Sequence, residues 1–529
     1  MTVSIFTEAN QFLRTGQLDK AVIAYHQAID QNPNFYAYYQ NLAEALAKRG
    51  DWQESVAAYR QAVKLNPSSA GCVYEYGTAL LHTGNFDEAV VILEKAINLN
   101  PESSDLYYSL GKALQQQGQL DTALDYFQKA LNLNPQFPKL YEQIGDILVA
   151  QGKGEEAISY WQNAIELGAG GWELYMKLGE TRQEQKDIDS AINYYQQALE
   201  LNPNSHWLHY KLGTALVTQG KLHEAIAAYK KAIELEPGAA IIHHYLGHTL
   251  SALHQWEDAI ASYRQALKLA PDAAVIYQHW GDALAAMQQW EEAVEKYRKS
   301  VELEPNSLEA QDHLGFAKAQ LGDVEEAIAS YRKALQISPS SDVVNSHLAD
   351  ALRQRETPSD LDEVINLYRK AIDSNPNNLE VCQKAVEIRP YDPELQGQLG
   401  YALGQQGHWQ EAIAAYRRSL DINPNNFWIQ HLLGDGLKTV GDFQEAIAAY
   451  HRATEINPGF AWSHHNLGEV LQQTEQWEEA IAAYRCATEV EQNVVQLYYD
   501  LGDALARVGY IEEAGAVYRK ALEIEIGNS

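Results

Sequence analysis

The sequence contains little cysteine. Its 529 residues include three cysteines, Cys72, Cys382 and Cys486, which lie far apart and form no CxxC motif. A disulfide framework and a cysteine-based zinc site are therefore excluded, because both need several cysteines at short spacings. We expect all three cysteines to be reduced, small apolar residues of a cytoplasmic protein.

Positive charge is also scarce. The chain has 40 Lys and Arg residues against 71 Asp and Glu residues, which gives a formal net charge of -31 at pH 7. Nucleic acids and anionic membranes are bound through clustered basic residues, so we expect neither as a partner. The acidic excess instead favours proteins or peptides with basic segments.

A leader sequence and a membrane span are not expected either. The stretch MTVSIFTEANQFLRTG has neither a basic start nor a sustained apolar run. No later segment reaches the roughly eighteen consecutive apolar residues that a transmembrane helix needs. The sequence therefore predicts neither secretion nor membrane insertion.

Motifs for catalysis and cofactor binding are missing as well. The sequence contains no GxSxG, GxxxxGK[ST], HExxH or CxxC pattern, so we expect no enzyme activity and no cofactor. His244 and His248 lie four residues apart on one predicted helix face, beside His243, and such a pair could supply two metal bonds. No carboxylate or cysteine completes a recognised ligand set there, so we expect no metal site.

What the chain does have is a period. Proline recurs in steps of 34 residues, with Ala169 filling one gap, and the same step resumes after a disturbance. The residues that mark it are Pro33, Pro67, Pro101, Pro135, Pro203, Pro237, Pro271, Pro305, Pro339, Pro390, Pro424 and Pro458. A fixed period of this length indicates an array of stacked supersecondary units.

One period, residues 206–239, reads HWLHYKLGTALVTQGKLHEAIAAYKKAIELEPGA. Leu212 and Leu216 have helical spacing, Gly220 interrupts the helix, and Tyr229 belongs to a second apolar helix face. Glycine suits the turn because it adopts left-handed backbone without a Cβ penalty. The same slot holds Gly16, Gly50, Gly84, Gly118, Gly152, Gly322, Gly407, Gly441 and Gly509. Each period is thus predicted to be a helical hairpin that stacks on its neighbours.

These residues resemble the tetratricopeptide repeat (TPR) family. Its pattern of a large residue, Leu-Gly, an apolar residue, Ala, an aromatic residue, Ala and Pro recurs as Tyr107, Leu110, Gly111, Leu114, Ala123, Phe127, Ala130 and Pro135. The resemblance covers about fifteen repeats and implies an all-α, right-handed superhelical solenoid of stacked antiparallel helix pairs. The chain is similar to the TPR arms of O-linked N-acetylglucosamine transferases, without a catalytic domain.

The register is disturbed between residues 342 and 390. The turn RQRETPSDLDE is lengthened, and Pro376 and Pro390 stand so close that only one short helix fits between them. We predict an N-terminal sub-array over residues 1–376, a truncated repeat and hinge at 377–390, and a C-terminal sub-array over 391–529. Alternatively, residues 377–390 merge with a neighbouring helix and cause little bend.

The last repeat raises a second expectation. Ile511, Val517, Leu522 and Ile524 belong to its second helix and are expected to lie partly open. Arrays of this kind usually need a polar capping element on an open end. The sequence leaves three alternatives open: this end packs on a partner, it packs on a second copy of the chain (self-association through the C-terminal repeat), or the open face is tolerated.

The family resemblance also implies a binding surface. Ligand contacts in TPR arrays come mainly from the second, fifth, ninth and twelfth positions of the first helices, counting His206 as position one. Carried over to this sequence, the candidate peptide-binding residues are Trp207, Tyr210, His244, Asp282, Asp350, Trp428, His431, Asp435, Trp462, His465, Glu469, Tyr499 and Asp503. Acids steer basic ligands and aromatic rings bind cations, so extended segments with Lys or Arg are the expected ligands.

The function predicted from the sequence is a non-catalytic interaction scaffold with an acidic, aromatic concave groove. The alternative is a substrate-recruiting or accessory arm for a protein-modifying enzyme, such as a glycosyltransferase, carried on another chain. A third interpretation is that the acids only keep a long array soluble. The carboxylate clamp of chaperone-binding TPRs is disfavoured because the groove has the wrong charge.

Overall fold

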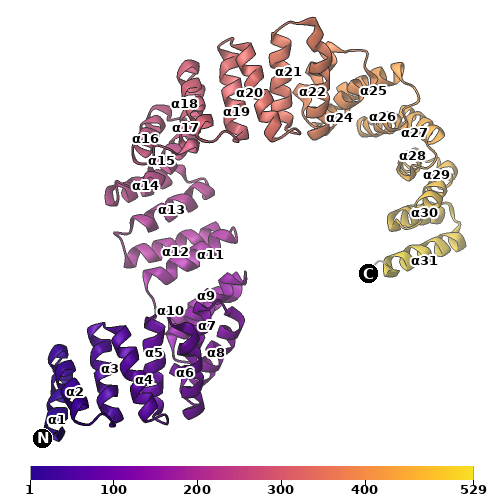
Figure 1. Ribbon diagram of the computed structural model, residues 1–529. Coiled ribbons are helices and arrows are strands. Elements are labelled where there is room, and N and C mark those ends of the chain that lie inside the picture. Colours follow the sequence, from indigo (N-terminus) through magenta and orange to yellow (C-terminus); the bar gives the residue numbers. More distant parts are fainter. Residues whose placement is uncertain (1, 528–529) are drawn as a thin grey trace. The chain divides into compact units, whose positions relative to one another are not determined.

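The computed structural model describes residues 2–527, and within this range it contains 31 α-helices, one short 3-10 helix and no strands (Figure 1). The helices alternate between the first and the second helix of each repeat. The first helices are α1 (Thr2–Arg14), α3 (Tyr36–Arg49), α5 (Ala70–His82), α7 (Ser104–Gln116), α9 (Pro138–Ala150), α11 (Trp172–Glu184), α13 (His206–Gln219), α15 (Ala240–Ala252), α17 (Ala274–Ala286), α19 (Leu308–Gln320), α21 (Asp342–Gln354), α24 (Pro393–Gln405), α26 (Phe427–Val440), α28 (Ala461–Gln473) and α30 (Val495–Val508).

The second helices have similar lengths. They are α2 (Leu18–Gln31), α4 (Trp52–Leu65), α6 (Phe86–Leu99), α8 (Leu120–Leu133), α10 (Gly154–Glu166), α12 (Ile188–Leu201), α14 (Leu222–Leu235), α16 (Trp256–Leu269), α18 (Trp290–Leu303), α20 (Val324–Ile337), α22 (Leu361–Ser374), α25 (Trp409–Ile422), α27 (Phe443–Ile456), α29 (Trp477–Val490) and α31 (Ile511–Gly527). The 3-10 helix η1 (Pro358–Asp360) and the short helix α23 (Leu379–Ile388) complete the set. The predicted all-α array of helix pairs is confirmed.

Most hairpins close because a glycine of the first helix faces an aromatic ring of the second. A Cβ built on Gly213 would lie 2.5 Å from Cε1 of Tyr229, and one on Gly434 would lie 2.6 Å from Cε1 of Tyr450. Such distances are far inside van der Waals contact, so a larger residue would push the two helices apart. The glycine and the aromatic residue of the sequence pattern therefore contact each other across the hairpin.

The turns between paired helices follow the prediction in most repeats. All ten glycines predicted for this slot have positive φ angles, for example +85° at Gly220 and +83° at Gly441. Five repeats place another residue there with φ between 55° and 65°, namely Lys186, His254, Gln288, Glu356 and Glu475. The turn geometry is thus constant, and in these five repeats it is imposed on residues that disfavour it.

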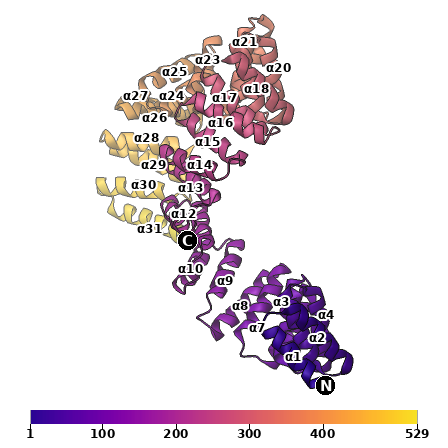
Figure 2. The ribbon, with the colours of Figure 1, turned by 90° about the vertical axis from the view of Figure 1, so that its left-hand side faces the viewer.

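The chain forms two compact units that divide between Leu253 and His254. In the first unit, a core of buried Leu, Ile, Val, Ala and aromatic residues extends from Ala9 to Leu178. In the second unit, a comparable core extends from Ala327 to Ala514. Within each unit the successive helices lie side by side in both views (Figures 1 and 2).

The irregular segment around residues 377–390 contains one short helix, as the proline spacing predicts. This helix, α23, is separate from α22 and α24, so it does not merge with either neighbour. Val381, Cys382 and Ala385 are buried and belong to the continuous core of the second unit. The hinge at this position stays a prediction.

The last described helix, α31, is partly open. Ile511 and Leu522 are exposed, Val517 is half-buried, and Ile524 is buried. Self-association through this helix stays a prediction. Within residues 2–527, no helix combines the length and the apolar character that crossing a bilayer requires.

Candidate functional site

The candidate residues occupy one face of the first helices, which we call the first-helix face. It consists of their second, fifth and ninth positions, which fall on one side of a helix because they are three, four or seven residues apart. The second-position indoles of Trp207, Trp428 and Trp462 are 39%, 43% and 43% exposed. Three of the five fifth-position candidates, Tyr210, His431 and His465, are buried beneath them. The tryptophans are therefore far more accessible than the rings beneath them.

Trp428 lies on a buried histidine. Its ring stacks on that of His431 with a centroid distance of 5.5 Å and an interplanar angle of 21°. His431 Nδ1 is 3.1 Å from the Ser463 hydroxyl, and Nε2 is 3.4 Å from the Asp435 carboxylate. Burial lowers the pKa of His431, and the charge of Asp435 only partly opposes this effect. The ring that supports Trp428 is thus kept neutral.

Trp462 lies on a histidine whose pKa is shifted in the opposite direction. The two rings meet edge to face at 5.4 Å, and His465 Nε2 is 2.7 Å from the Asp500 carboxylate. Burial by itself would lower the pKa of His465, but the hydrogen bonds with Asp500 and Asn466 and the charge of Glu469 outweigh it, so the pKa is raised. Equivalent positions in adjacent repeats therefore favour opposite charge states.

The ninth-position acids have partners within the chain. The Tyr297 and Tyr450 hydroxyls, both on second helices, donate to Asp282 and Asp435 at 2.8 and 2.5 Å. Tyr368 donates to Asp350, and Tyr518 donates to Asp503 at 2.6 Å. Each of these bonds joins the two helices of one repeat. The acids therefore have a structural role beside any contact with a ligand.

Other contacts join ninth-position acids to the following repeat. Lys177 is 2.8 Å from Asp146, Lys211 is 2.9 Å from Glu180, and His313 is 2.8 Å from Asp282. Asn466 donates to Asp435 at 2.9 Å. In each case the ninth position of one repeat meets the sixth position of the next, and we call this series the nine-to-six ladder.

The remaining candidate residues have contacts of other kinds. The cation beside Asp350 comes from the short helix α23, whose Lys384 lies at 2.8 Å. Glu469 is held by Lys438 at 2.9 Å, from the preceding repeat. Tyr499 donates to Glu525 at 3.2 Å, and the ring of the half-buried His244 is 5.6 Å from that of Tyr245. Asp503 is exposed.

The sequence did not reveal the cations of the ladder. Lys177, Lys211 and Lys384 are ordinary charged residues in a single sequence, and each is 31 or 34 residues from its acid. One signal was present in the sequence. In two successive cases, an acid at position nine of one repeat is followed by a lysine at position six of the next repeat. Stacking then brings the two positions together.

The structure offers no cluster for metal binding in the part of the chain that it describes. No group of three or more His, Cys, Asp or Glu side chains in residues 2–527 is arranged to hold an ion. Cys72 and Cys382 are buried, and burial raises the pKa of the Cys72 thiol to about 11. A thiol with a raised pKa is a poor nucleophile at neutral pH.

The matches to protein-family models run along most of the chain. A tetratricopeptide repeat model matches residues 4–169. A TPR repeat model matches residues 182–220, 213–254, 281–322, 400–438 and 440–475. Two further tetratricopeptide repeat models match residues 240–273 and 308–341, and residues 465–529. A comparison with curated proteins finds no match.

Several solved structures are similar to parts of the chain. YrrB, described as a TPR protein with an unusual peptide-binding site, is 26% identical over 37% of this chain and 97% of its own, with a TM-score of 0.33. MamA from Desulfovibrio magneticus RS-1 is 25% identical over 31% of this chain and 94% of its own, with a TM-score of 0.31. Yeast Tom70 is 19% identical over 73% of this chain and 95% of its own, with a TM-score of 0.35. On its helix pairs and its family matches, the chain belongs to the tetratricopeptide repeat family.

Proposed function

We propose that the protein is a non-catalytic scaffold that binds extended peptide segments with Lys or Arg along the first-helix face. One observation carries the proposal: exposed indoles lie on the same helix face as half-buried carboxylates. Trp428 and Asp435 are seven residues apart on α26, and Trp462 and Glu469 are seven apart on α28. Seven residues make two helical turns, so each indole and its carboxylate lie on one side of the helix.

Glu469 is already paired with Lys438, but the two neutral partners of Asp435 do not cancel its attraction for a cation. The neutral Tyr450 and Asn466 side chains that donate to Asp435 leave its negative charge in place. The whole chain carries a formal charge of -31, which raises the rate at which basic ligands approach. A guest cation would therefore gain both a carboxylate and an indole face, and cation–π contacts at exposed sites contribute about 0.5–1 kcal/mol each.

The test uses a fluorescein-labelled, extended peptide with several lysines and fluorescence anisotropy. We expect Trp428→Ala combined with Trp462→Ala to weaken binding by about tenfold, because two cation–π contacts are lost. Tyr391→Ala is the matched control, since Tyr391 is 86% exposed but lies between repeats and outside the first-helix face. Charge reversal of Asp435, Glu469 and Asp503 should also weaken binding. Unchanged binding in both variants would leave solubility as the role of the acids.

A further inference from the structure

The nine-to-six ladder is interrupted in the repeat formed by α13 and α14. The ninth position there is Thr214, whose hydroxyl donates to the carbonyl of Lys211 at 2.7 Å. The tyrosine that meets the ninth-position acid in other repeats is Tyr229, and its hydroxyl has no hydrogen-bond partner among the described residues. The Tyr229 side chain is fully buried. A buried hydroxyl without a partner costs about 1–3 kcal/mol, so this position calls for a ligand that supplies one.

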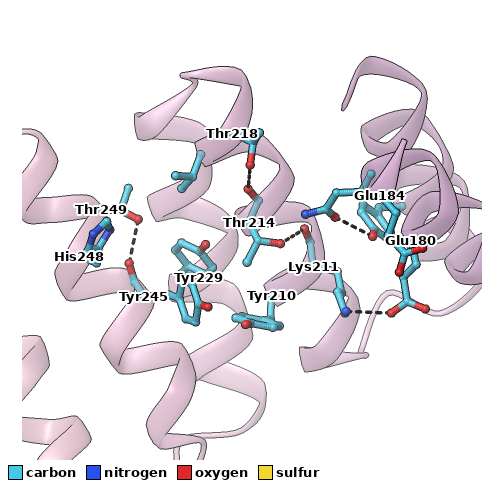
Figure 3. A pocket seen from close by; sticks show the side chains of 13 residues that line it. Glu180, Glu184, Tyr210, Lys211, Thr214, Thr218, Tyr229, Tyr245, His248 and Thr249 are labelled. Carbon is cyan, nitrogen blue, oxygen red and sulfur yellow. Dashed lines mark hydrogen bonds and ion pairs between the residues drawn. The ribbon is translucent and has the colours of Figure 1, made fainter. Parts of the chain in front are cut away.

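A cavity of about 690 Å³ lies at this interruption (Figure 3). It is formed by residues of α11 to α15, all within the first compact unit. The rings of Tyr210, Tyr229 and Tyr245 gather on it, with centroid distances of 6.2 Å between Tyr210 and Tyr229 and 5.4 Å between Tyr210 and Tyr245. Two further aromatic rings therefore lie beside the ring that carries the unpartnered hydroxyl.

The cavity is rich in hydrogen-bond acceptors. The hydroxyls of Thr218 and Thr249 donate to the backbone carbonyls of Thr214 and Tyr245 at 3.1 and 2.8 Å, and Thr214 has used its proton in the same way. A hydroxyl whose proton is engaged can only accept a further hydrogen bond. The carboxylates of Glu180 and Glu184 also line the cavity. A suitable ligand must therefore donate several hydrogen bonds and carry positive charge.

An earlier repeat contains a positively charged donor at the equivalent place. The ammonium of Lys177, at the sixth position, lies 2.8 Å from Asp146 and 6.0 Å from the centre of the Trp161 ring. Trp161 occupies the place in its repeat that Tyr229 occupies two repeats later, and Tyr245 stands where Lys177 would. Around Tyr229 the chain thus provides the aromatic rings and the acceptors. The ammonium of Lys211, which also lines the cavity, is engaged by Glu180 at 2.9 Å.

We propose that this cavity receives a lysine side chain of a bound peptide. The ammonium donates to the Tyr229 hydroxyl and to the threonine oxygens, and it lies against the tyrosine rings within the field of Glu180 and Glu184. Lys211 leaves room for this guest because it is engaged by Glu180 at 2.9 Å. This inference rests on the proposed function, since it names the side chain for which one part of the first-helix face is specific.

The test compares two labelled peptides that differ at one position. A short glycine- and serine-based peptide carries either a single lysine or norleucine, which keeps the aliphatic chain and removes the ammonium. We expect the lysine peptide to bind the full-length protein about tenfold more tightly, and Tyr229→Phe to remove most of this selectivity. The thermal stability of Tyr229→Phe should be unchanged or higher, because the variant deletes a hydroxyl that had no partner.

Tyr297→Phe is the matched control. Its hydroxyl donates to Asp282 at 2.8 Å, so this variant should lose stability and keep the selectivity for lysine. If the protein binds the lysine peptide selectively and Tyr229→Phe keeps that selectivity, the cavity is not the lysine site, although the proposed function stands. If neither this peptide nor a peptide with several lysines binds the unmodified protein, the proposed function itself is overturned.

Discussion

At the level of single residues, five inter-helix turns hold a residue other than glycine in left-handed backbone. Gln288, with φ of 59°, is the counterpart of Gly322, with φ of 83°, in the following repeat. The left-handed conformation costs an ordinary residue about 1–2 kcal/mol. The array accepts this cost because the turn is fixed by the packing of two helices on both sides.

The first prediction concerns these turns. Gln288→Gly should stabilise its repeat by about 0.5–1 kcal/mol, because relief of the strain exceeds the extra freedom that glycine has in the unfolded chain. Gly322→Ala, the reverse change one repeat later, should destabilise by about 1 kcal/mol. Urea unfolding midpoints measure both. A loss of stability in Gln288→Gly would show that the turn carries no strain.

The second prediction concerns the two buried histidines. NMR titration should place the midpoint of His431 below about 6.5 and that of His465 above it. Protonation of His465 is favoured in the fold, so its contribution to stability is full below about pH 6.5 and is lost as pH rises through the folded-state pKa. His431 acts in the opposite sense, and its burial lowers stability as pH falls below about 6.5. Coincident midpoints would contradict the assigned contacts.

At the level of helices, the nine-to-six ladder connects several first helices with the next. We predict that Lys177→Met destabilises the fold by about 1–2 kcal/mol, because the half-buried Asp146 loses a charge-assisted hydrogen bond. Lys64→Met is the control, since Lys64 is exposed on α4. A double-mutant cycle with Asp146→Asn isolates the pair, and a coupling energy near zero would mean that the contact is incidental.

The short helix α23 gives a fourth prediction. It has 10 residues and no second helix of its own, and Lys384 ties it to Asp350 of α21. Amide hydrogen exchange should be faster in α23 than in α21 or α25, as a hinge requires, and faster still in Lys384→Met. Equal protection in all three helices would speak for a rigid connection at residues 377–390.

The sequence predicted the helix pairs because their signals are local or strictly periodic. The glycine at position eight and the tyrosine of the second helix, as in Gly213 and Tyr229, recur at one offset, and Gly220 marks the turn between them. The candidate site was only partly predictable. Whether Tyr210 or His465 is accessible depends on the rings packed around it, which no spacing reveals. The unpartnered hydroxyl of Tyr229 could be found only once the ladder was visible.

At the level of the whole molecule, the excess of acids predicts how binding depends on salt. The affinity for a peptide with several lysines should fall as ionic strength rises from about 0.05 to 0.5 M, mainly through a slower association rate. Stopped-flow fluorescence measures that rate. The same measurement with a norleucine-substituted peptide is the control, and an equal salt response of both peptides would exclude steering by charge.

The ladder also has a consequence for how such a chain can change by recombination. In several repeats the ninth position is matched to the sixth position of the repeat that follows it, as Asp146 is to Lys177. Other repeats lack this match. Glu44 at a ninth position faces Glu75 at the following sixth position, and the pKa of Glu75 is raised, first by burial and then by the charge of Glu44. Moving the repeat with Glu75 behind Asp146 would therefore set two carboxylates against each other. Although the repeats share one pattern, they are not interchangeable, and their order is part of the information that specifies the fold.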